Sequence, residues 1–226
     1  MARAHDSRSR PPDAVAVIGL GRFGGALALE LMAAGTDVLG IDGDEDTVQA
    51  LNGRLTHVVQ ADSTKEAVLR QLGVPEFERV VVGIGSDIQA SILTTSLLLR
   101  FEIPQLWAKA VSEAHGLILQ QLGMQHVIYP EKDMGRRVAH LVRGSMQDYL
   151  EIEPGFSLVK TTPAARFLGV ALRELDLLRT HGVAVTAIKS PSGSWQHVTG
   201  DTVLGPTDLV LVSGSTAAAE AFSQLR

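Results

Sequence analysis

Three glycines near the N-terminus have the spacing of a phosphate-binding turn. Gly19, Gly21 and Gly24 form the pattern Gly-x-Gly-x-x-Gly, after the apolar run 15–18 and before an amphipathic helix pattern. The first glycine permits a tight bend, the second lets a phosphate approach the backbone, and the third lets the helix pack against the strand. The N–H groups at the start of the helix then face the phosphates. This order predicts a dinucleotide-binding turn, and the alternative is a glycine-rich turn that binds nothing.

Charged side chains accompany this turn. Arg22 lies within the glycine pattern and is followed by Phe23 at the expected start of the helix. A guanidinium there can reach the terminal phosphates of a nucleotide, and the alternative is a solvated surface arginine. Asp42 ends the next apolar run, about 20 residues after the glycines, where an acceptor for ribose hydroxyls is expected. The alternative for Asp42 is a helix cap. A carboxylate there would repel a 2′-phosphate, which disfavours NADP.

Polar residues follow three later apolar runs. Asp62 and Ser63 come after the third run and could hydrogen-bond the edge of an adenine, although either could instead cap a helix. Gly85 and Ser86 follow the fourth run and could let the backbone approach a ligand, or form a plain turn. Lys109 ends the fifth run and could contact a phosphate, or lie on the surface.

The apolar runs alternate with helix patterns. Each run is short and rich in Val, Ile or Leu, as expected of strands covered on both faces. This alternation predicts an α/β fold with a doubly wound, parallel, Rossmann-like sheet, whose ligand edge lies at the carboxyl ends of the strands. The expected strands are 14–18, 37–41, 56–60, 79–83, 105–109 and 126–128, and the expected helices are 23–34, 44–53, 64–72, 87–100 and 112–122.

A different pattern follows residue 129. An expected crossover helix begins at Pro130, and its apolar stripe could close the domain or cross to a neighbouring subunit. Later strands with few helices predict a smaller α+β domain with a mainly antiparallel sheet. Its expected strands are 150–152, 156–161, 183–189, 195–198 and 208–212, and its expected helices are 168–174 and 215–224. We therefore expect a disordered lead-in over 1–13, a nucleotide-binding domain over 14–145 and a regulatory domain over 146–226.

Composition excludes several classes of function. The chain has 226 residues, 45% of them apolar, a formal net charge of −5 and no cysteine. Thiol catalysis, disulfides and cysteine-based metal centres are therefore excluded. The negative charge argues against nucleic acid as a partner. No apolar run reaches the ~18–20 residues of a membrane span. The seven histidines show no His-x-x-x-His pair.

Five segments together resemble the regulator-of-potassium-conductance (RCK) family, and within it the cytosolic gating subunits of Ktr-type potassium uptake systems (the KtrA/TrkA type). They occur in family order across about 14–145, and the chain after residue 150 resembles the family's small C-terminal regulatory domain. The segments are Ile-Gly-Leu-Gly-Arg-Phe-Gly-Gly (18–25), Ala-Asp-Ser-Thr (61–64), Gly-Ile-Gly-Ser-Asp-Ile-Gln-Ala-Ser (83–91), Trp-Ala-Lys-Ala (107–110) and Ile-Tyr-Pro-Glu-Lys-Asp-Met-Gly (128–135).

The resemblance implies a regulatory function rather than an enzymatic one. Such proteins form homodimers that assemble into an octameric ring beneath a membrane potassium-translocating subunit of the KtrB/TrkH type. The resemblance implies a cytoplasmic protein, peripherally associated with the inner face of the cell membrane. ATP favours the conductive state and ADP the inactive state, and Arg22 is implied to sense the γ-phosphate. Some members bind cyclic di-AMP in the C-terminal domain, whose pocket-lining strand resembles 181–189.

Glu131 acquires a role from the same resemblance. It lies at the start of a helix, where the dipole favours an anion. In the resembled subunits this glutamate meets the nucleotide phosphates through a divalent cation near the dimer interface. Mg²⁺ needs only one or two carboxylates when phosphates supply other ligands, so one glutamate is sufficient. The alternative is a solvated glutamate in the first turn of a helix.

Two other functions compete with this interpretation. The glycine pattern also permits an NAD-dependent oxidoreductase. The candidate acid–base groups of such an enzyme are only His181 and His197. The pattern equally permits an NAD(H)-binding redox sensor without chemistry, or a transcription factor of that kind. The acidic net charge and the lack of a basic recognition helix weaken the DNA-binding version.

Overall fold

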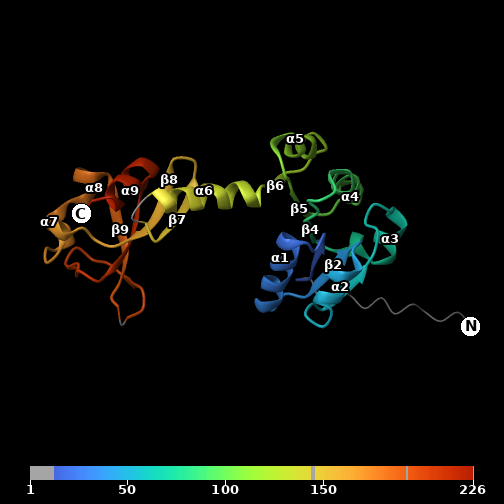
Figure 1. Cartoon of the computed structure of the whole chain (residues 1–226), viewed down its shortest axis with the longest axis horizontal. Coiled ribbons are helices and arrows are strands. Elements are labelled where there is room, and N and C mark those ends of the chain that lie inside the picture. The colour runs from blue at the N-terminus through green and yellow to red at the C-terminus, as the bar shows by residue number, and fades with distance from the viewer. Residues whose placement is uncertain (1–12, 144–145, 192, 226) are drawn as a thin grey trace, which may run out of the picture. The chain divides into compact units, whose positions relative to one another are not determined.

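The computed structural model describes residues 13–143, 146–191 and 193–225 (Figure 1). The chain divides into two units, Met1–Glu131 and Lys132–Arg226. This division falls within the helix that begins at Pro130. The boundary expected from the sequence, after residue 145, stays a prediction. Residues 1–12, which make up nearly all of the expected lead-in, lie outside the described residues.

The first unit contains a six-stranded sheet in the order β3-β2-β1-β4-β5-β6, in which every neighbouring pair is parallel. This confirms the predicted doubly wound, Rossmann-like sheet, and each strand lies within one residue of its expected bounds. The strands are β1 (Val15–Ile18), β2 (Val38–Asp42), β3 (His57–Gln60), β4 (Arg79–Val82), β5 (Gln105–Lys109) and β6 (His126–Ile128).

Alternate residues of β1 face two separate cores. Val15 and Val17 pack with residues of the first two helices, and Ala16 and Ile18 pack with residues of the next three. Because helices cover both faces, the open part of this sheet is the edge at the carboxyl ends of its strands. The helices are α1 (Arg22–Ala33), α2 (Glu45–Leu51), α3 (Glu66–Gln71), α4 (Ile88–Arg100) and α5 (Glu113–Gln121), with a short 3₁₀ turn at Val74–Glu76.

The second unit contains a five-stranded sheet in the order β10-β9-β11-β8-β7. All of its neighbouring strands are antiparallel, which confirms the predicted class of sheet. Its core includes Val183, Val210 and Phe222, and α9 packs against β8 and β11. The elements from the crossover helix onward are α6 (Pro130–Arg143), β7 (Asp148–Glu153), β8 (Phe156–Thr161), a 3₁₀ turn (Ala165–Phe167), α7 (Leu172–Leu175), α8 (Leu177–His181), β9 (Val183–Lys189), β10 (Gln196–His197), β11 (Leu209–Ser215) and α9 (Thr216–Ser223).

Polar side chains attach α6 to the second unit. Arg137 donates to Asp148 of β7 over 2.6 Å. His140 hydrogen-bonds Glu220 of α9 and stacks on Tyr149, with ring centroids 4.0 Å apart. These contacts explain why most of α6 groups with the later strands rather than with the parallel sheet.

The expected helix over 168–174 is wrong over 168–171 and confirmed over 172–174, which lie in α7. Leu168 and Ala171 instead form isolated bridges with Leu204 and Val203. The apolar spacing of this segment resembles that of a helix, but pairing with the chain before β11 takes up its backbone groups first. The local spacing of apolar residues carries no information about such long-range pairing.

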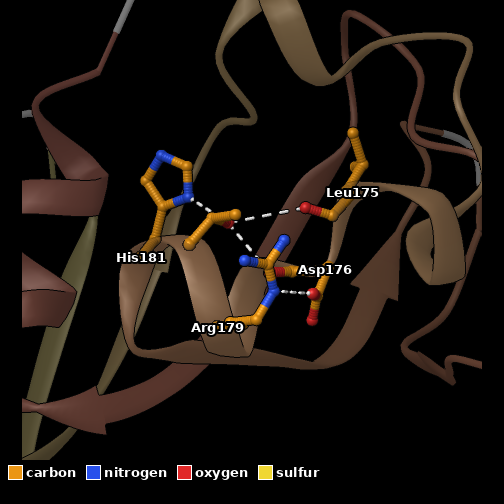
Figure 2. Close-up of polar contacts among 5 residues, drawn as sticks. Leu175, Asp176, Arg179 and His181 are labelled. Carbon is orange, nitrogen blue, oxygen red and sulfur yellow. Dashed lines mark hydrogen bonds and ion pairs between the residues drawn. The ribbon is translucent and has the colours of Figure 1, made fainter.

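A left-handed residue separates α7 from α8. Asp176 has a φ of 43°, a conformation that residues other than glycine seldom adopt. Two contacts stabilise this conformation. The Thr180 hydroxyl donates to the Asp176 carbonyl over 2.8 Å. Arg179 Nε donates to the Asp176 carboxylate over 2.5 Å (Figure 2). The Nδ1 of His181 lies 2.8 Å from the same hydroxyl. These contacts make the break between the two helices a fixed bend.

Among the helices of the described ranges, none combines the length and the apolarity needed to cross a membrane.

Candidate functional site

A cavity of about 1110 Å³ lies at the carboxyl ends of the parallel strands of the first unit. The strand order reverses direction between β1 and β4, which is where open α/β sheets bind ligands. All but one of the residues predicted from the sequence line this cavity. They are Gly19, Gly21, Arg22, Phe23, Asp42, Asp62, Ser63, Gly85, Ser86, Lys109 and Glu131.

Two glycines of the turn leave space for different neighbours, Gly24 for another part of the protein and Gly21 for a ligand. A Cβ at Gly24 would lie 1.9 Å from the carbonyl oxygen of Gly19, so this glycine serves close packing of α1 and does not line the cavity. A Cβ at Gly21 would meet no protein atom within 4 Å. Gly21 borders the cavity, so the space above it is available to a ligand.

Asp42 anchors the turn from the end of β2. Its Oδ2 accepts the Leu20 N–H over 2.5 Å, and its Oδ1 accepts the Asp44 N–H over 2.9 Å. The cap of α2 is Asp44, which accepts the Thr47 N–H over 2.9 Å, so the cap alternative for Asp42 is wrong. An ionised carboxylate has about four acceptor positions, so Asp42 can still accept from a ribose hydroxyl.

Asp62 and Ser63 do not cap α3, whose N-cap is Lys65 without a side-chain bond. Asp62 accepts the N–H and the hydroxyl of Thr64 over 2.9 and 2.6 Å, and these hydrogen bonds hold the pKa of Asp62 below its usual value. Ser63 is buried, and its hydroxyl lies 2.9 Å from that of Thr94 on α4. Both residues therefore line the cavity rather than cap a helix.

Lys109 and Glu131 form an ion pair inside the cavity, with Lys109 Nζ 2.6 Å from Glu131 Oε1. The Lys109 side chain is 9% exposed and that of Glu131 is 61% exposed, so the surface-lysine alternative is wrong. The Lys109 hydrogen bond holds the pKa of Glu131 below its usual value, and the charge of Arg22 acts in the same direction. The Phe23 ring lies 5.8 Å from Nζ. Three charged groups thus gather at one end of the site.

The packing of Tyr129, two residues before Glu131, was not predicted from the sequence. Tyr129 precedes the start of α6, and a Cβ at Gly116 of α5 would lie 1.7 Å from the Tyr129 hydroxyl oxygen. The missing side chain of Gly116 therefore makes room for this ring. An isolated glycine within a helix pattern was the only available signal.

A metal ion would find one carboxylate at this end of the cavity. In the part of the chain that the structure describes, no group of three or more His, Cys, Asp or Glu side chains could hold a metal ion. Glu131 alone fits a site at which phosphates supply further oxygen ligands, because Mg²⁺ combines one or two carboxylates with phosphates and water. The donor set therefore fits a metal ion whose other ligands are phosphates or water, and the protein alone would hold such an ion only weakly.

Comparison with known proteins gives a family match. A family model described as the TrkA-N domain matches residues 15–130. Ktr system potassium uptake protein C of Bacillus subtilis is 38% identical over 201 residues, which cover 88% of this chain and 91% of that protein. Ktr system potassium uptake protein A of the same organism is 39% identical over 175 residues, covering 77% of this chain and 79% of that protein.

Solved structures with the same fold include RCK domains. The GsuK RCK domain matches 98% of this chain and 50% of its own, with a TM-score of 0.63 and 16% identity. The GsuK channel bound to NAD matches 97% of this chain and 41% of its own, with a TM-score of 0.63 and 17% identity. At these identities the likeness shows the fold.

Proposed function

The chain belongs to the TrkA-N family of Ktr-type potassium uptake proteins, and we propose that it is a nucleotide-sensing regulatory subunit that gates a membrane potassium transporter or channel. In this proposal ATP and ADP switch the conformation of the subunit, and the chain is not an enzyme. The observation that carries the proposal is the cluster of Arg22, Lys109 and Glu131 beside an open glycine turn. Such a cluster can distinguish nucleotides by their terminal phosphate.

Each part of the cavity has a proposed partner on the nucleotide. Asp42 accepts from the ribose hydroxyls, and Asp62 and Ser63 face the adenine edge. The turn at Gly19, Gly21, Arg22 and Phe23 holds the first phosphates against the start of α1, and Gly24 lets that helix pack close to the turn. Lys109 and the Arg22 guanidinium reach the terminal phosphates, with Gly85 and Ser86 on the opposite wall.

A divalent cation such as Mg²⁺ would neutralise charge between the phosphates and Glu131. Because a regulatory ligand acts only through different affinities for two states, the γ-phosphate is the natural discriminator. ATP presents that group to Arg22 and to a cation at Glu131, whereas ADP lacks it.

The assembly is also a proposal. We expect homodimers within an octameric ring, at the cytoplasmic face of the membrane and against a KtrB/TrkH-like translocating subunit. Met134, Val138 and Val142 lie along α6 and are 54%, 45% and 80% exposed, which suits a helix that packs against a second copy. No role for nucleic acid is proposed.

The second unit offers a place for a second ligand. A cavity of about 400 Å³ lies beside α8 and β9, lined in part by Val183, Ala184 and Val185. If cyclic di-AMP binds this chain, we propose that it binds there. Val183 and Ile188 also belong to the core of the second unit, so this strand packs the domain as well as bordering the cavity.

NAD(H) is the second candidate ligand. A structural neighbour is described as bound to NAD, and Asp42 suits an unphosphorylated ribose. The oxidoreductase alternative is weaker, because no histidine occurs among the described residues that line the cavity. His181 is hydrogen-bonded within the second unit, to Thr180 and Arg166.

Calorimetric titration with ATP, ADP, NAD⁺ and NADH, each with and without Mg²⁺, tests the ligand. We expect ATP and ADP to bind tightly and Mg²⁺ to strengthen ATP binding selectively. A strong preference for NAD⁺ or NADH, with weak binding of ATP and ADP, would instead support a redox sensor.

Potassium flux tests the gating. The purified chain is added to liposomes that contain its translocating partner, and flux is measured with ATP and with ADP. Faster flux with ATP is the expected result, and equal flux with both nucleotides contradicts the proposal. The partner without this chain serves as the control for nucleotide-independent flux.

A further inference from the structure

The Lys109 ammonium is a buried charge with a single described carboxylate partner. The side chain is 9% exposed, and its Nζ lies 2.6 Å from Glu131 Oε1. A buried ammonium is unfavourable unless an anion pairs with it, so Glu131 is required by Lys109 in this state. Glu131 is 61% exposed and could remain ionised in water without Lys109. Lys109 therefore depends on Glu131 for a counter-charge more than Glu131 depends on Lys109.

The neighbouring residues keep a place for this ammonium. A Cβ at Gly85 would lie 3.3 Å from Lys109 Nζ, tighter than an ordinary contact. The Phe23 ring lies 5.8 Å from the same atom on another side. Gly85 and Phe23 both line the cavity, so the ammonium sits within the ligand space rather than behind it.

We propose that Lys109 is a built-in counter-cation that occupies the place at Glu131 which a divalent cation would otherwise take. This inference rests on the proposed function. A nucleoside diphosphate such as ADP then binds without a metal ion, because Lys109 already neutralises the carboxylate that faces the phosphates. A third phosphate attracts the ammonium away from Glu131, and only then does the carboxylate require a divalent cation.

Charge explains why the two cations exclude one another. An ammonium and a divalent ion on one carboxylate repel each other, and this repulsion is strong where water is scarce. Lysine can change partners because its ammonium carries three donors on a flexible stem. Lys109 is thereby a specificity-determining residue that makes metal binding conditional on the number of phosphates.

The first test uses the nucleotide-free protein and Mn²⁺, whose binding is followed by electron paramagnetic resonance. The wild type and Glu131→Gln should bind Mn²⁺ alike, because Lys109 masks Glu131. Lys109→Met should bind Mn²⁺ at least about threefold more tightly, since the repelling charge is gone. The double variant Lys109→Met/Glu131→Gln should return to the wild-type affinity.

Lys65→Met is the matched control. Lys65 Nζ lies 3.8 Å from Asp62, another carboxylate of the cavity, but the lysine side chain is 67% exposed. Its removal should leave Mn²⁺ binding as in the wild type, because an exposed pair is well screened.

The second test measures ADP affinity with and without Mg²⁺. For the wild type we expect a difference below about threefold, and for Lys109→Met a loss of at least about tenfold without Mg²⁺, because an unmasked Glu131 repels the phosphates. The double variant should again lose the dependence on Mg²⁺.

Two results would overturn the inference. One is Mn²⁺ binding by Lys109→Met no tighter than by the wild type, with Lys109→Gln measured if the methionine variant does not fold. The other is tighter Mn²⁺ binding by the nucleotide-free wild type than by Glu131→Gln, a comparison that needs no Lys109 variant. Failure of every nucleotide to bind would overturn the proposed function, and the Mn²⁺ measurement would still decide the role of Lys109.

Discussion

Two carboxylates on opposite halves of the parallel sheet are held in different ways. Asp42, the last residue of β2, accepts the backbone N–H groups of Leu20, in the glycine turn, and of Asp44. Glu131, after β6, accepts one side-chain ammonium and is 61% exposed. A backbone donor cannot leave without unfolding its turn, whereas a lysine can take another partner. One half of the site is therefore a fixed cradle, and the other half can exchange its contacts when a ligand arrives.

The largest effect expected in the fixed half comes from Gly24→Ala. The added Cβ would lie 1.9 Å from a backbone oxygen, so α1 must shift. We expect the free energy of unfolding to fall by about 3 kcal/mol or more, measured by urea denaturation.

Gly21→Ala separates binding from stability in the same turn. Its Cβ meets no protein atom within 4 Å, so stability should change by less than about 0.5 kcal/mol, while nucleotide binding is lost because the methyl group occupies the phosphate position. Gly135→Ala, in α6 and equally free of contacts, is the control and should bind normally. Normal binding by Gly21→Ala would place the phosphates elsewhere.

Asp42→Ala tests the anchor of the cradle. It leaves the N–H of Leu20, a residue 3% exposed, without its acceptor, so we expect a loss of about 2 kcal/mol of stability and weaker binding of every nucleotide. Ser112→Ala, which removes the cap of α5 and does not line the cavity, should cost about 1 kcal/mol and keep nucleotide affinity. Equal binding losses in the two variants would show that the ribose contact is not specific to Asp42.

Arg22→Ala tests the exchangeable half. We expect the ratio of ATP to ADP affinity to narrow by about tenfold, or about 1.4 kcal/mol, with little change in ADP affinity. Calorimetry of both nucleotides measures the ratio. Equal losses for ATP and ADP would remove Arg22 as a sensor of the γ-phosphate.

The smallest effect is the pH dependence of the Lys109–Glu131 pair. The pKa of Glu131 is lowered by its bond to Lys109, so the pair contributes fully above the ordinary glutamate pKa of about 4.3, and the contribution is lost as the pH falls through the lowered value. Because Glu131 is 61% exposed, we expect less than about 1 kcal/mol. The free energy of unfolding, measured by urea denaturation between about pH 6 and pH 3, should therefore depend less on pH in Glu131→Gln than in the wild type. The same pH dependence in both proteins would contradict the prediction.

The parallel half of the fold could be read from the sequence because its signals are local. Each strand of the first unit is short, and it either ends in a glycine or polar residue or is followed directly by one. The cavity residues come at or near those ends. The segment 168–174 could not be read in this way, since its partners lie near residues 203–204. The α+β class of the second unit was still predicted correctly, because apolar and polar residues alternate clearly along its strands.

The residues that line the site could be predicted from the sequence, but their contacts with one another could not. Arg22 and Asp42 were found from their spacing to the glycines. The burial of Lys109 and its bond to Glu131 depend on a meeting of β5 with the start of α6, which no spacing reveals. The second hydrogen bond of Asp42, to Leu20, likewise joins two strand ends that are distant in sequence.

The fit of Tyr129 against Gly116 has a consequence for how this sequence can change over generations. Any side chain at position 116 would collide with the ring at position 129, and a smaller residue at 129 would leave a hole above the glycine. A substitution at either place is therefore tolerated best when the other changes with it. Among descendants of this sequence the two positions should be inherited as a pair, and an exchange at 116 alone should be rare.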